Sequence, residues 1–233
     1  MTGSAGRGSD GPCVVVVTRA PGSPAAKTRL AQGIGDAACR RLQEAFLEDT
    51  LAWAGALGAH RVLSVHPAGD APEVAARAPG WTVVPQVESD FGERMRGAVN
   101  AGFAAGGAPV AMIATDSPTL PPERIEQAWR AVTSGGADVA LAPAHDGGWV
   151  LIASRDPLAP GCFEGVRWSA GRTLADTRSA MARHGRRTAL LDAWYDVDTA
   201  DDLERLAADL RAGAARRLPR TAAALAPPAR PGA

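Results

Sequence analysis

The run Val14-Val15-Val16-Val17 decides the fold of this 233-residue chain. Four consecutive β-branched residues between the turn-forming pairs Gly11-Pro12 and Pro21-Gly22 predict a strand that is buried on both faces. A strand of this kind belongs in the middle of a sheet that helices cover on both sides. Further along the chain, short apolar runs alternate with stretches in which apolar residues recur at helical spacing.

This alternation predicts parallel β-α-β units in one sheet. Further strands are expected at residues 61–65, 81–84, 109–114, 138–142, 149–153 and 188–191. Helices are expected at about residues 36–57, 91–103, 121–132, 173–184 and 200–210. The pair Gly147-Gly148 suggests a hairpin and therefore one antiparallel strand. The expected fold is a single α/β domain, Rossmann-like, with a mixed, mostly parallel central sheet flanked by helices.

The two ends of the chain differ from its middle in composition. Residues 1–11 are polar and rich in glycine, and residues 212–233 are rich in Ala, Pro and Arg without periodicity. Both segments are expected to be disordered, which leaves residues 12–211 as the folded domain. Because no apolar run has the length of a membrane span or the character of a signal-peptide core, a cytoplasmic protein is expected.

Charge and cysteine content exclude several classes of function. The 25 Lys and Arg residues balance the 25 Asp and Glu residues, so no overall field attracts nucleic acid or an anionic membrane. Cys13, Cys39 and Cys162 lie too far apart for a Cys-x-x-Cys zinc site, and three cysteines do not make a disulfide framework. Any anion binding therefore has to come from the local placement of charge.

Lys27 is the only lysine in a chain that otherwise uses arginine. It lies in Ala26-Lys27-Thr28-Arg29-Leu30, shortly after the first strand. A single lysine among so many arginines suggests that this position needs a compact, flexible ammonium group rather than a planar guanidinium. Lys27 and Arg29 together could clamp phosphate oxygens. The alternative is a solvated loop lysine without a ligand.

Carboxylates follow two of the other strands. Asp116 comes directly after the strand in the middle of the chain, and Asp196 and Asp198 come after the last strand. Ligands bind beyond the carboxyl ends of the strands in open α/β sheets, so these residues are expected to meet Lys27 on one rim. Since Mg²⁺ prefers carboxylate and phosphate oxygens, a phosphate-plus-metal site is predicted. The alternative is that Asp116 and Asp198 are helix N-caps.

Three further segments are candidates for the same rim. In His145-Asp146-Gly147-Gly148-Trp149 the glycines let the backbone approach a ligand, the tryptophan can stack on a ring, and the aspartate can orient or deprotonate a hydroxyl. The alternative is a tight turn with a core tryptophan. Trp168-Ser169 precedes a helix, where Ser169 could be only a cap. Arg94 lies in an early helical turn, where a solvated face is the alternative.

Seven segments, taken in order, mark a family. They are Val14 to Thr18, Lys27-Thr28-Arg29-Leu30, Phe91-Gly92-Glu93-Arg94-Met95, Thr115-Asp116-Ser117-Pro118, His145-Asp146-Gly147-Gly148-Trp149, Trp168-Ser169 and Asp196-Val197-Asp198-Thr199. Over about residues 12–210 the chain resembles the bacterial arsenosugar-biosynthesis-type glycosyltransferases, a group within the GT-A nucleotide-diphospho-sugar transferase superfamily. The resemblance implies a Rossmann-like GT-A domain that binds an activated nucleotide with a divalent cation.

The chain is also similar to a neighbouring family of guanylyltransferases that act on phospholactate or phosphoenolpyruvate. That resemblance implies that Asp116 and Asp198 hold magnesium and that Lys27 and Arg29 hold the triphosphate. The Gly-x-Gly-x-x-Met loop of ordinary nucleotidyltransferases is absent from the sequence. Asp116-Ser117-Pro118 stands where many GT-A glycosyltransferases have Asp-x-Asp.

The expected function is that of a glycosyltransferase-like enzyme with an NDP-sugar donor, bound with Mg²⁺ or Mn²⁺, and a small-molecule acceptor. The alternatives are a nucleotidyltransferase, which would transfer NMP from an NTP to a small phosphorylated acceptor and release pyrophosphate, and a non-catalytic nucleotide-binding protein. The expected catalytic residues are Asp146 and Asp116, and the metal ligands are Asp116 and Asp198. The expected nucleotide contacts are Lys27, Thr28, Arg29, Arg94, Gly147, Gly148, Trp149, Trp168 and Ser169. Nothing in the sequence specifies an oligomer.

Overall fold

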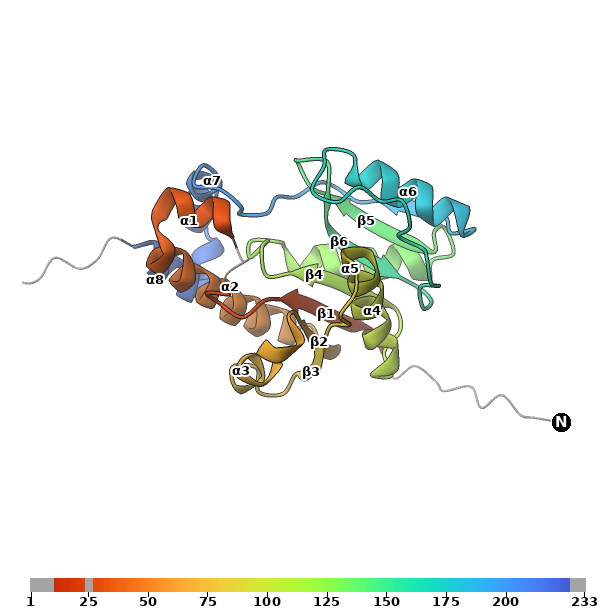
Figure 1. The fold of residues 1–233 in the computed structure, drawn as a ribbon, viewed down its shortest axis with the longest axis horizontal. Helices are drawn as coiled ribbons and strands as arrows, with labels where there is room; N and C mark the ends of the chain where they lie inside the picture. The colour runs from red at the N-terminus through yellow and green to blue at the C-terminus, as the bar shows by residue number, and fades with distance from the viewer. Residues whose placement is uncertain (1–10, 24–26, 227–233) are drawn as a thin grey trace, which may run out of the picture.

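A seven-stranded sheet in the order β3-β2-β1-β4-β6-β5-β7 runs through the middle of the protein. The computed structural model describes residues 11–23 and 27–226 (Figure 1). The strands are β1 (Cys13–Thr18), β2 (His60–Val65), β3 (Thr82–Pro85), β4 (Val110–Ala114), β5 (Val139–Pro143), β6 (Trp149–Ser154) and β7 (Thr188–Leu190). The helices are α1 (Thr28–Ile34), α2 (Asp36–Gly55), α3 (Ala71–Ala76), α4 (Phe91–Ala104), α5 (Pro122–Thr133), α6 (Thr173–Arg183), α7 (Asp202–Arg211) and α8 (Pro219–Leu225), with short 3-10 turns η1 (Ala68–Asp70) and η2 (Ala214–Arg216).

Strand β1 is an interior strand, third in the order of the sheet, and pairs in parallel with both β2 and β4. Val14 and Val16 pack into one apolar core with α2, α5 and α7, whereas Val15 packs into a second core with α4 and α6. All three side chains are fully buried. The valine run therefore has a helical layer on each side, and the predicted α/β fold with a mixed, mostly parallel sheet is confirmed.

Strand β6 is antiparallel to both of its neighbours, β4 and β5. A tight turn at residues 144–148 joins it to β5, as the Gly147-Gly148 pair predicts. Because β6 runs the opposite way, its first residue, Trp149, lies at the same edge of the sheet as the carboxyl ends of β1 and β4. The hairpin thereby places its turn and Trp149 beside the segments that follow the parallel strands.

The expectation of a disordered tail from residue 212 is wrong for its first part. The chain forms η2 and α8, and α8 packs against α2. The backbone N–H of Thr221 donates to Oδ2 of the fully buried Asp49 at 2.8 Å, and the guanidinium of Arg217 donates to the carbonyls of Thr119 and Leu120 at 2.8 Å each. A helix this short shows no clear apolar periodicity in the sequence. The residues that hold it in place lie far away along the chain. Residues 1–10 and 227–233, which were also expected to be disordered, lie outside the described residues.

Within the described part of the chain, no helix combines the length and the apolar character that a membrane span requires.

Candidate functional site

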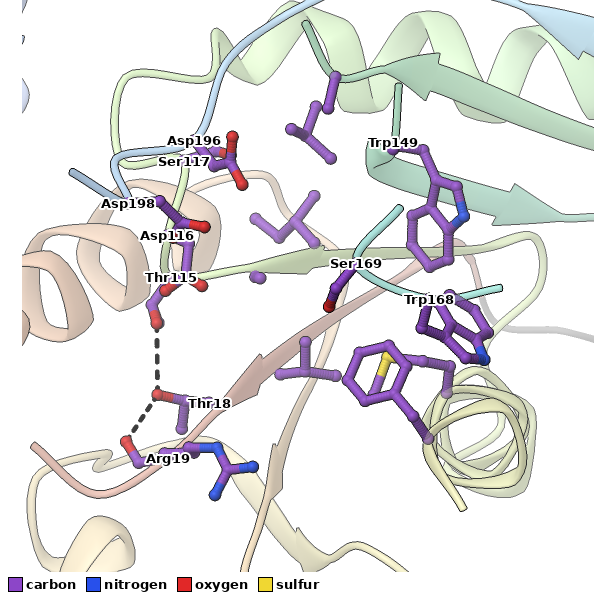
Figure 2. Close-up of a pocket in the computed structure, with 18 of the residues that line it drawn as sticks. Thr18, Arg19, Thr115, Asp116, Ser117, Trp149, Trp168, Ser169, Asp196 and Asp198 are labelled. Atoms are coloured by element: carbon purple, nitrogen blue, oxygen red, sulfur yellow. Dashed lines mark hydrogen bonds between the residues drawn. The ribbon is translucent and has the colours of Figure 1, made fainter. Parts of the chain in front are cut away.

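A cavity of about 820 Å³ opens at the edge of the sheet where β1 and β4 end and β6 begins. The segment after β7 and the loop before α6 complete its wall. Figure 2 shows Asp116, Asp196 and Asp198 grouped on one side of the cavity and Trp149 and Trp168 grouped on another. The predicted convergence of distant segments on one rim is therefore present in the structure.

Lys27 lies at the centre of the acidic side. Its Nζ is 2.6 Å from Oδ1 of Asp198, 3.2 Å from Oδ2 of Asp116 and 2.7 Å from the carbonyl oxygen of Val197. Only 6% of the Lys27 side chain is exposed. Its backbone has left-handed torsion angles (φ 55°, ψ 41°) at the residue that precedes α1. Lys27 is thus a buried cation between two carboxylates, which rules out the solvated-loop alternative.

The protonation of Lys27 depends on these neighbours. Burial by itself lowers the pKa of the ammonium group, but the charges of Asp116 and Asp198 and their hydrogen bonds outweigh it, so the pKa is raised. Arg29 donates to the other oxygen of Asp198 at 2.8 Å, from a side chain that is 67% exposed. Lys27 is therefore a cation fixed in place, whereas the exposed side chain of Arg29 can turn toward a ligand.

Neither Asp116 nor Asp198 caps a helix. Helix α5 begins after Pro121 and has no side-chain cap, and α7 begins after Asp201, also without one. The carboxylate of Asp202 accepts hydrogen bonds from the backbone N–H groups of Asp198 and Thr199 at 2.9 and 2.8 Å. The backbone of Val197 donates to the carbonyl of Asp116 at 2.8 Å, which joins the two segments. Both carboxylates are therefore directed to Lys27 and the cavity.

Asp196 lies beside this cluster and lines the same cavity. Burial, followed by the negative charge of Asp198, raises its pKa to about 6, and the charge of Lys27 only partly opposes this. A cation placed among Asp116, Asp196 and Asp198 would favour the ionised form of Asp196. The cluster thus carries more negative charge than Lys27 alone balances.

Aromatic rings form the opposite wall. The ring centroids of Trp168 and Phe91 are 4.7 Å apart in an edge-to-face arrangement, and those of Trp168 and Trp149 are 6.1 Å apart. Phe163 stacks on Trp149 at 6.4 Å. The indole N–H of Trp149 donates to Oγ1 of Thr177 at 3.2 Å, so that ring is held in one orientation. A fixed aromatic surface of this kind suits a planar ring of a ligand.

The turn before Trp149 is both a structural turn and part of the cavity. Oδ1 of Asp146 accepts a hydrogen bond from the backbone N–H of Gly148 at 2.9 Å, and both residues line the cavity. Gly147 is not among the lining residues. It has φ +88°, and a Cβ there would collide with the carbonyl oxygen of Gly171. Gly147 thus permits close packing of two loops, while Asp146 and Gly148 face the site.

The other predicted contact residues also line the cavity. They are Thr28, the first residue of α1, together with Arg94, Trp168 and Ser169. Ser169 is exposed and has a left-handed backbone (φ 54°), and α6 has no side-chain cap from it. Arg94 lies over the ring of Phe91, with 5.2 Å from Cζ to the ring centroid. The rim therefore contains every predicted nucleotide contact except Gly147.

Several lining residues were missed by the sequence analysis. Arg19 follows β1, His66 follows β2, and Gln86 follows β3. Thr18 and Thr115 face each other across the strand ends, with their hydroxyl oxygens 3.4 Å apart (Figure 2). The available signal was position alone, because each of these residues ends a parallel strand or follows one directly.

The donor set at the acidic side suits a hard divalent cation. Among the described residues, no three side chains of His, Cys, Asp or Glu converge as a ready-made metal site. Magnesium does not require one, since it is usually held by one or two carboxylates together with substrate phosphates and water. Asp116, which is 46% exposed, and Asp198 meet this requirement with oxygen lone pairs that Lys27 leaves free.

Comparisons with known proteins place this geometry in a family. The family described as "Uncharacterized protein conserved in bacteria (DUF2064)" matches residues 50–170. A 2-phospho-L-lactate guanylyltransferase from Halobacterium salinarum is 31% identical over 181 residues, which cover 76% of this chain and 77% of that protein.

Two solved structures extend the comparison. One from Desulfovibrio desulfuricans, provisionally named a nucleotide-diphospho-sugar transferase, is 31% identical with a TM-score of 0.81 and covers 92% of this chain and 93% of its own. The 4-diphosphocytidyl-2C-methyl-D-erythritol synthase of Anaerococcus prevotii is 12% identical with a TM-score of 0.55, over 86% of this chain and 96% of its own, and shows likeness of fold alone.

These relatives are transferases named for nucleotide substrates, and the nucleotide-transferase fold predicted from the sequence is confirmed. The narrower arsenosugar-biosynthesis group is not confirmed by these matches. The chain belongs to the DUF2064 family of bacterial proteins and is similar in sequence to a guanylyltransferase.

Proposed function

We propose that this protein is a nucleotidyltransferase that moves NMP from an NTP to a small phosphorylated acceptor and releases pyrophosphate. The observation that carries the proposal is the cluster of Lys27 and Arg29 with Asp116 and Asp198 at one end of a cavity of about 820 Å³. Its support in sequence is the guanylyltransferase that is 31% identical over 76% of this chain. Glycosyl transfer, the function expected from the sequence, thus becomes the second candidate.

Lys27 and Arg29 contact the triphosphate in this proposal. Lys27 is a point charge on a flexible stem, so its Nζ can contact a phosphate oxygen while it keeps the carbonyl of Val197. Arg29, which is largely exposed, leaves Asp198 and donates to the β- or γ-phosphate. The triphosphate brings more negative charge than a diphosphate, and two cations beside it favour an NTP donor.

Asp116 and Asp198 would hold a divalent cation, Mg²⁺ or Mn²⁺, beside the nucleotide phosphates. The bound ion supplies charge neutralisation on the phosphates and a fixed orientation for in-line transfer. The pKa of Asp196 is about 6, and a divalent cation beside it would favour the ionised form. The ionised carboxylate would in turn add to the affinity of the acidic cluster for the cation.

The chemistry is a displacement at the α-phosphorus. An oxygen of the acceptor phosphate forms a bond to that phosphorus while the bond to the bridging oxygen of the β-phosphate breaks, and pyrophosphate takes the electron pair. An ionised acceptor phosphate has no proton to lose, so no general base is needed, and catalysis rests on positioning and charge. Asp146 then serves to hold the turn that positions Trp149, and Trp149 and Trp168 stack on a ring of the nucleotide.

The test is a panel of α-labelled NTPs, with GTP first, against small phosphorylated acceptors with Mg²⁺. Transfer of the α-label to the acceptor, together with release of unlabelled pyrophosphate that depends on the acceptor, supports the proposal. Asp116→Asn should lower kcat/KM by about 100-fold or more, because a transition-state contact is lost. Asp192→Asn is the matched control, since this aspartate is 80% exposed and pairs with Arg124 away from the cavity. Equal loss in both variants, or no pyrophosphate with any NTP, contradicts the proposal.

Glycosyl transfer is the second candidate, because the Desulfovibrio desulfuricans structure with the same fold and 31% identity carries a nucleotide-diphospho-sugar transferase name. In that case Asp146 would orient or deprotonate the acceptor hydroxyl. Release of NDP from an NDP-sugar, without pyrophosphate from any NTP, would favour it.

A further inference from the structure

The end of the cavity away from Lys27 contains a second cluster that the proposed function does not use. It consists of Arg19 after β1, His66 after β2 and Arg94 in the first turn of α4. Figure 2 shows Arg19 on the side of the drawn cavity opposite Asp196. Cations at both ends of one cavity suggest two anionic groups in the bound substrates.

Within the described part of the chain, no ion pair balances the positive charge of this cluster. Nε of Arg94 is buried and has no hydrogen-bond partner in the described part of the chain. Burial, followed by the charge of Arg19, lowers the pKa of Arg94, and the charges of Glu88 and Asp90 only partly oppose this. Glu88 accepts a bond from the backbone of Ala68 at 3.3 Å, and Asp90 caps α4. The two guanidinium groups therefore repel each other at the cavity wall.

His66 adds an uncharged polar atom to the same place. Its Nδ1 is buried and also has no partner among the described residues. Burial and the charges of Arg94 and Arg19 lower the pKa of His66, so the ring is neutral at pH 7. In the tautomer that carries its proton on Nδ1, this atom is a buried donor without an acceptor, and a ligand oxygen would recover the free energy that this costs.

We propose that Arg19 and Arg94, with His66, form a second anion site that takes a carboxylate or phosphate group of the acceptor. A guanidinium fork binds either group with two parallel hydrogen bonds, and an anion there would offset the repulsion between the two arginines. The assignment to the acceptor rests on the proposed function, in which Lys27 and Arg29 take the nucleotide phosphates at the other end. The acceptor is then a molecule with two anionic groups, the reacting phosphate and a second one.

Side-chain NMR of Arg94 tests whether an anion binds. Its Nε–H resonance, identified by its loss in Arg94→Lys, should shift saturably on titration with inorganic phosphate or with acetate. Arg19→Gln should weaken the affinity for the probe about tenfold or more. Arg41→Gln, at an exposed residue outside the cavity, should leave it unchanged. A resonance that does not shift, or equal affinity in Arg19→Gln with unchanged thermal unfolding, would overturn the site.

Two comparisons assign the anion. A lower dissociation constant for acetate indicates that the site binds a carboxylate group. A lower dissociation constant for inorganic phosphate indicates that it binds a phosphate group. The titration is then repeated with GTP bound: an unchanged response supports the acceptor, whereas a lost response assigns the cluster to the nucleotide and overturns the acceptor assignment. If no NTP binds or releases pyrophosphate, the proposed function fails, while the first titration still decides whether the anion site exists.

Discussion

The ammonium nitrogen of Lys27 lies 2.6 Å from Oδ1 of Asp198, although the two residues are 171 positions apart. This contact joins the loop after the first strand to the segment after the last one. Asp116, from the central part of the chain, contacts the same nitrogen at 3.2 Å. One lysine therefore links three strand ends of the sheet, and its loss should affect both stability and binding.

Lys27→Met should lower the free energy of unfolding by about 1–3 kcal/mol, because two carboxylates lose their shared cation. The loss is smaller than for a fully buried pair, since the Asp116 side chain is 46% exposed and gains water. Urea unfolding measures this change. Lys27→Arg keeps the charge and should lose less stability, yet it should still weaken nucleotide binding, because a planar guanidinium does not fit the place of a point charge. Wild-type affinity in Lys27→Arg would return Lys27 to a purely structural role.

Asp196→Asn should make the protein more stable at neutral pH. The pKa of Asp196 is raised from 3.8 to about 6 in the folded protein, so between these values the folded state binds more protons than the unfolded state and stability falls as pH rises. The full displacement corresponds to at most about 3 kcal/mol, and partial exposure reduces it to about 1–2 kcal/mol.

Urea unfolding of the wild type and Asp196→Asn near pH 4 and near pH 7 measures this difference. The advantage of the variant should be present above about pH 6 and should disappear toward pH 4. An advantage that is the same at both pH values would show that the effect comes from packing and not from ionisation.

Gly147→Ala should destabilise the protein by more than the cost of its torsion angle alone. The residue has φ +88°, and a methyl group would collide with the carbonyl of Gly171. Gly135→Ala is the matched control, because Gly135 has φ +83° and nothing within 4 Å of the added carbon. The control should cost about 1 kcal/mol from backbone strain. Gly147→Ala should cost at least about 1 kcal/mol more and should also weaken nucleotide binding, because Gly171 lines the cavity. Equal unfolding free energies for the two variants would contradict the packing role.

Asp49→Ala should release the C-terminal helix from α2. The fully buried Asp49 carboxylate accepts the backbone N–H of Thr221 at 2.8 Å and that of Arg220 at 3.3 Å at the start of α8. Its removal should cost about 1–3 kcal/mol and should open the helix to proteolysis. Glu48→Ala is the control, because among the described residues Glu48 forms ion pairs with the half-buried Arg77 and the exposed Arg220, and its loss should cost less than about 1 kcal/mol. Similar protease sensitivity in both variants would contradict the role of Asp49 as an anchor.

Local patterns were enough for most of the sheet and its flanking helices. The valine run of β1 and the helical spacing in α4 and α5 are properties of neighbouring residues, so the sequence predicts them directly. Short elements escaped this reasoning. Helix α1 and helix α8 are each 7 residues long, too short for a clear periodicity, and α8 is held by distant partners such as Asp49.

The rim of the site was also predictable in part. Asp116 and Lys27 follow parallel strands, and the carboxyl ends of such strands meet at one edge, so their convergence follows from topology. The alternatives could not be separated at that level, because a capping aspartate and a ligand-facing aspartate occur in the same sequence context. The structure separates these two alternatives for Asp198. In the turn that precedes α7, the carboxylate of Asp202, and not that of Asp198, accepts the backbone N–H hydrogen bonds.

The order of residues alone thus specifies a sheet with a buried central strand and an edge where charged residues gather, because alternation and burial are local and periodic. Tertiary packing alone decides that Lys27 is held by two aspartates, that Gly147 faces a loop and not the cavity, and that Arg94 and Arg19 bring like charges to one cavity wall. These features depend on distances between side chains far apart in the chain, and such distances are set by how the loops and helices pack on the sheet.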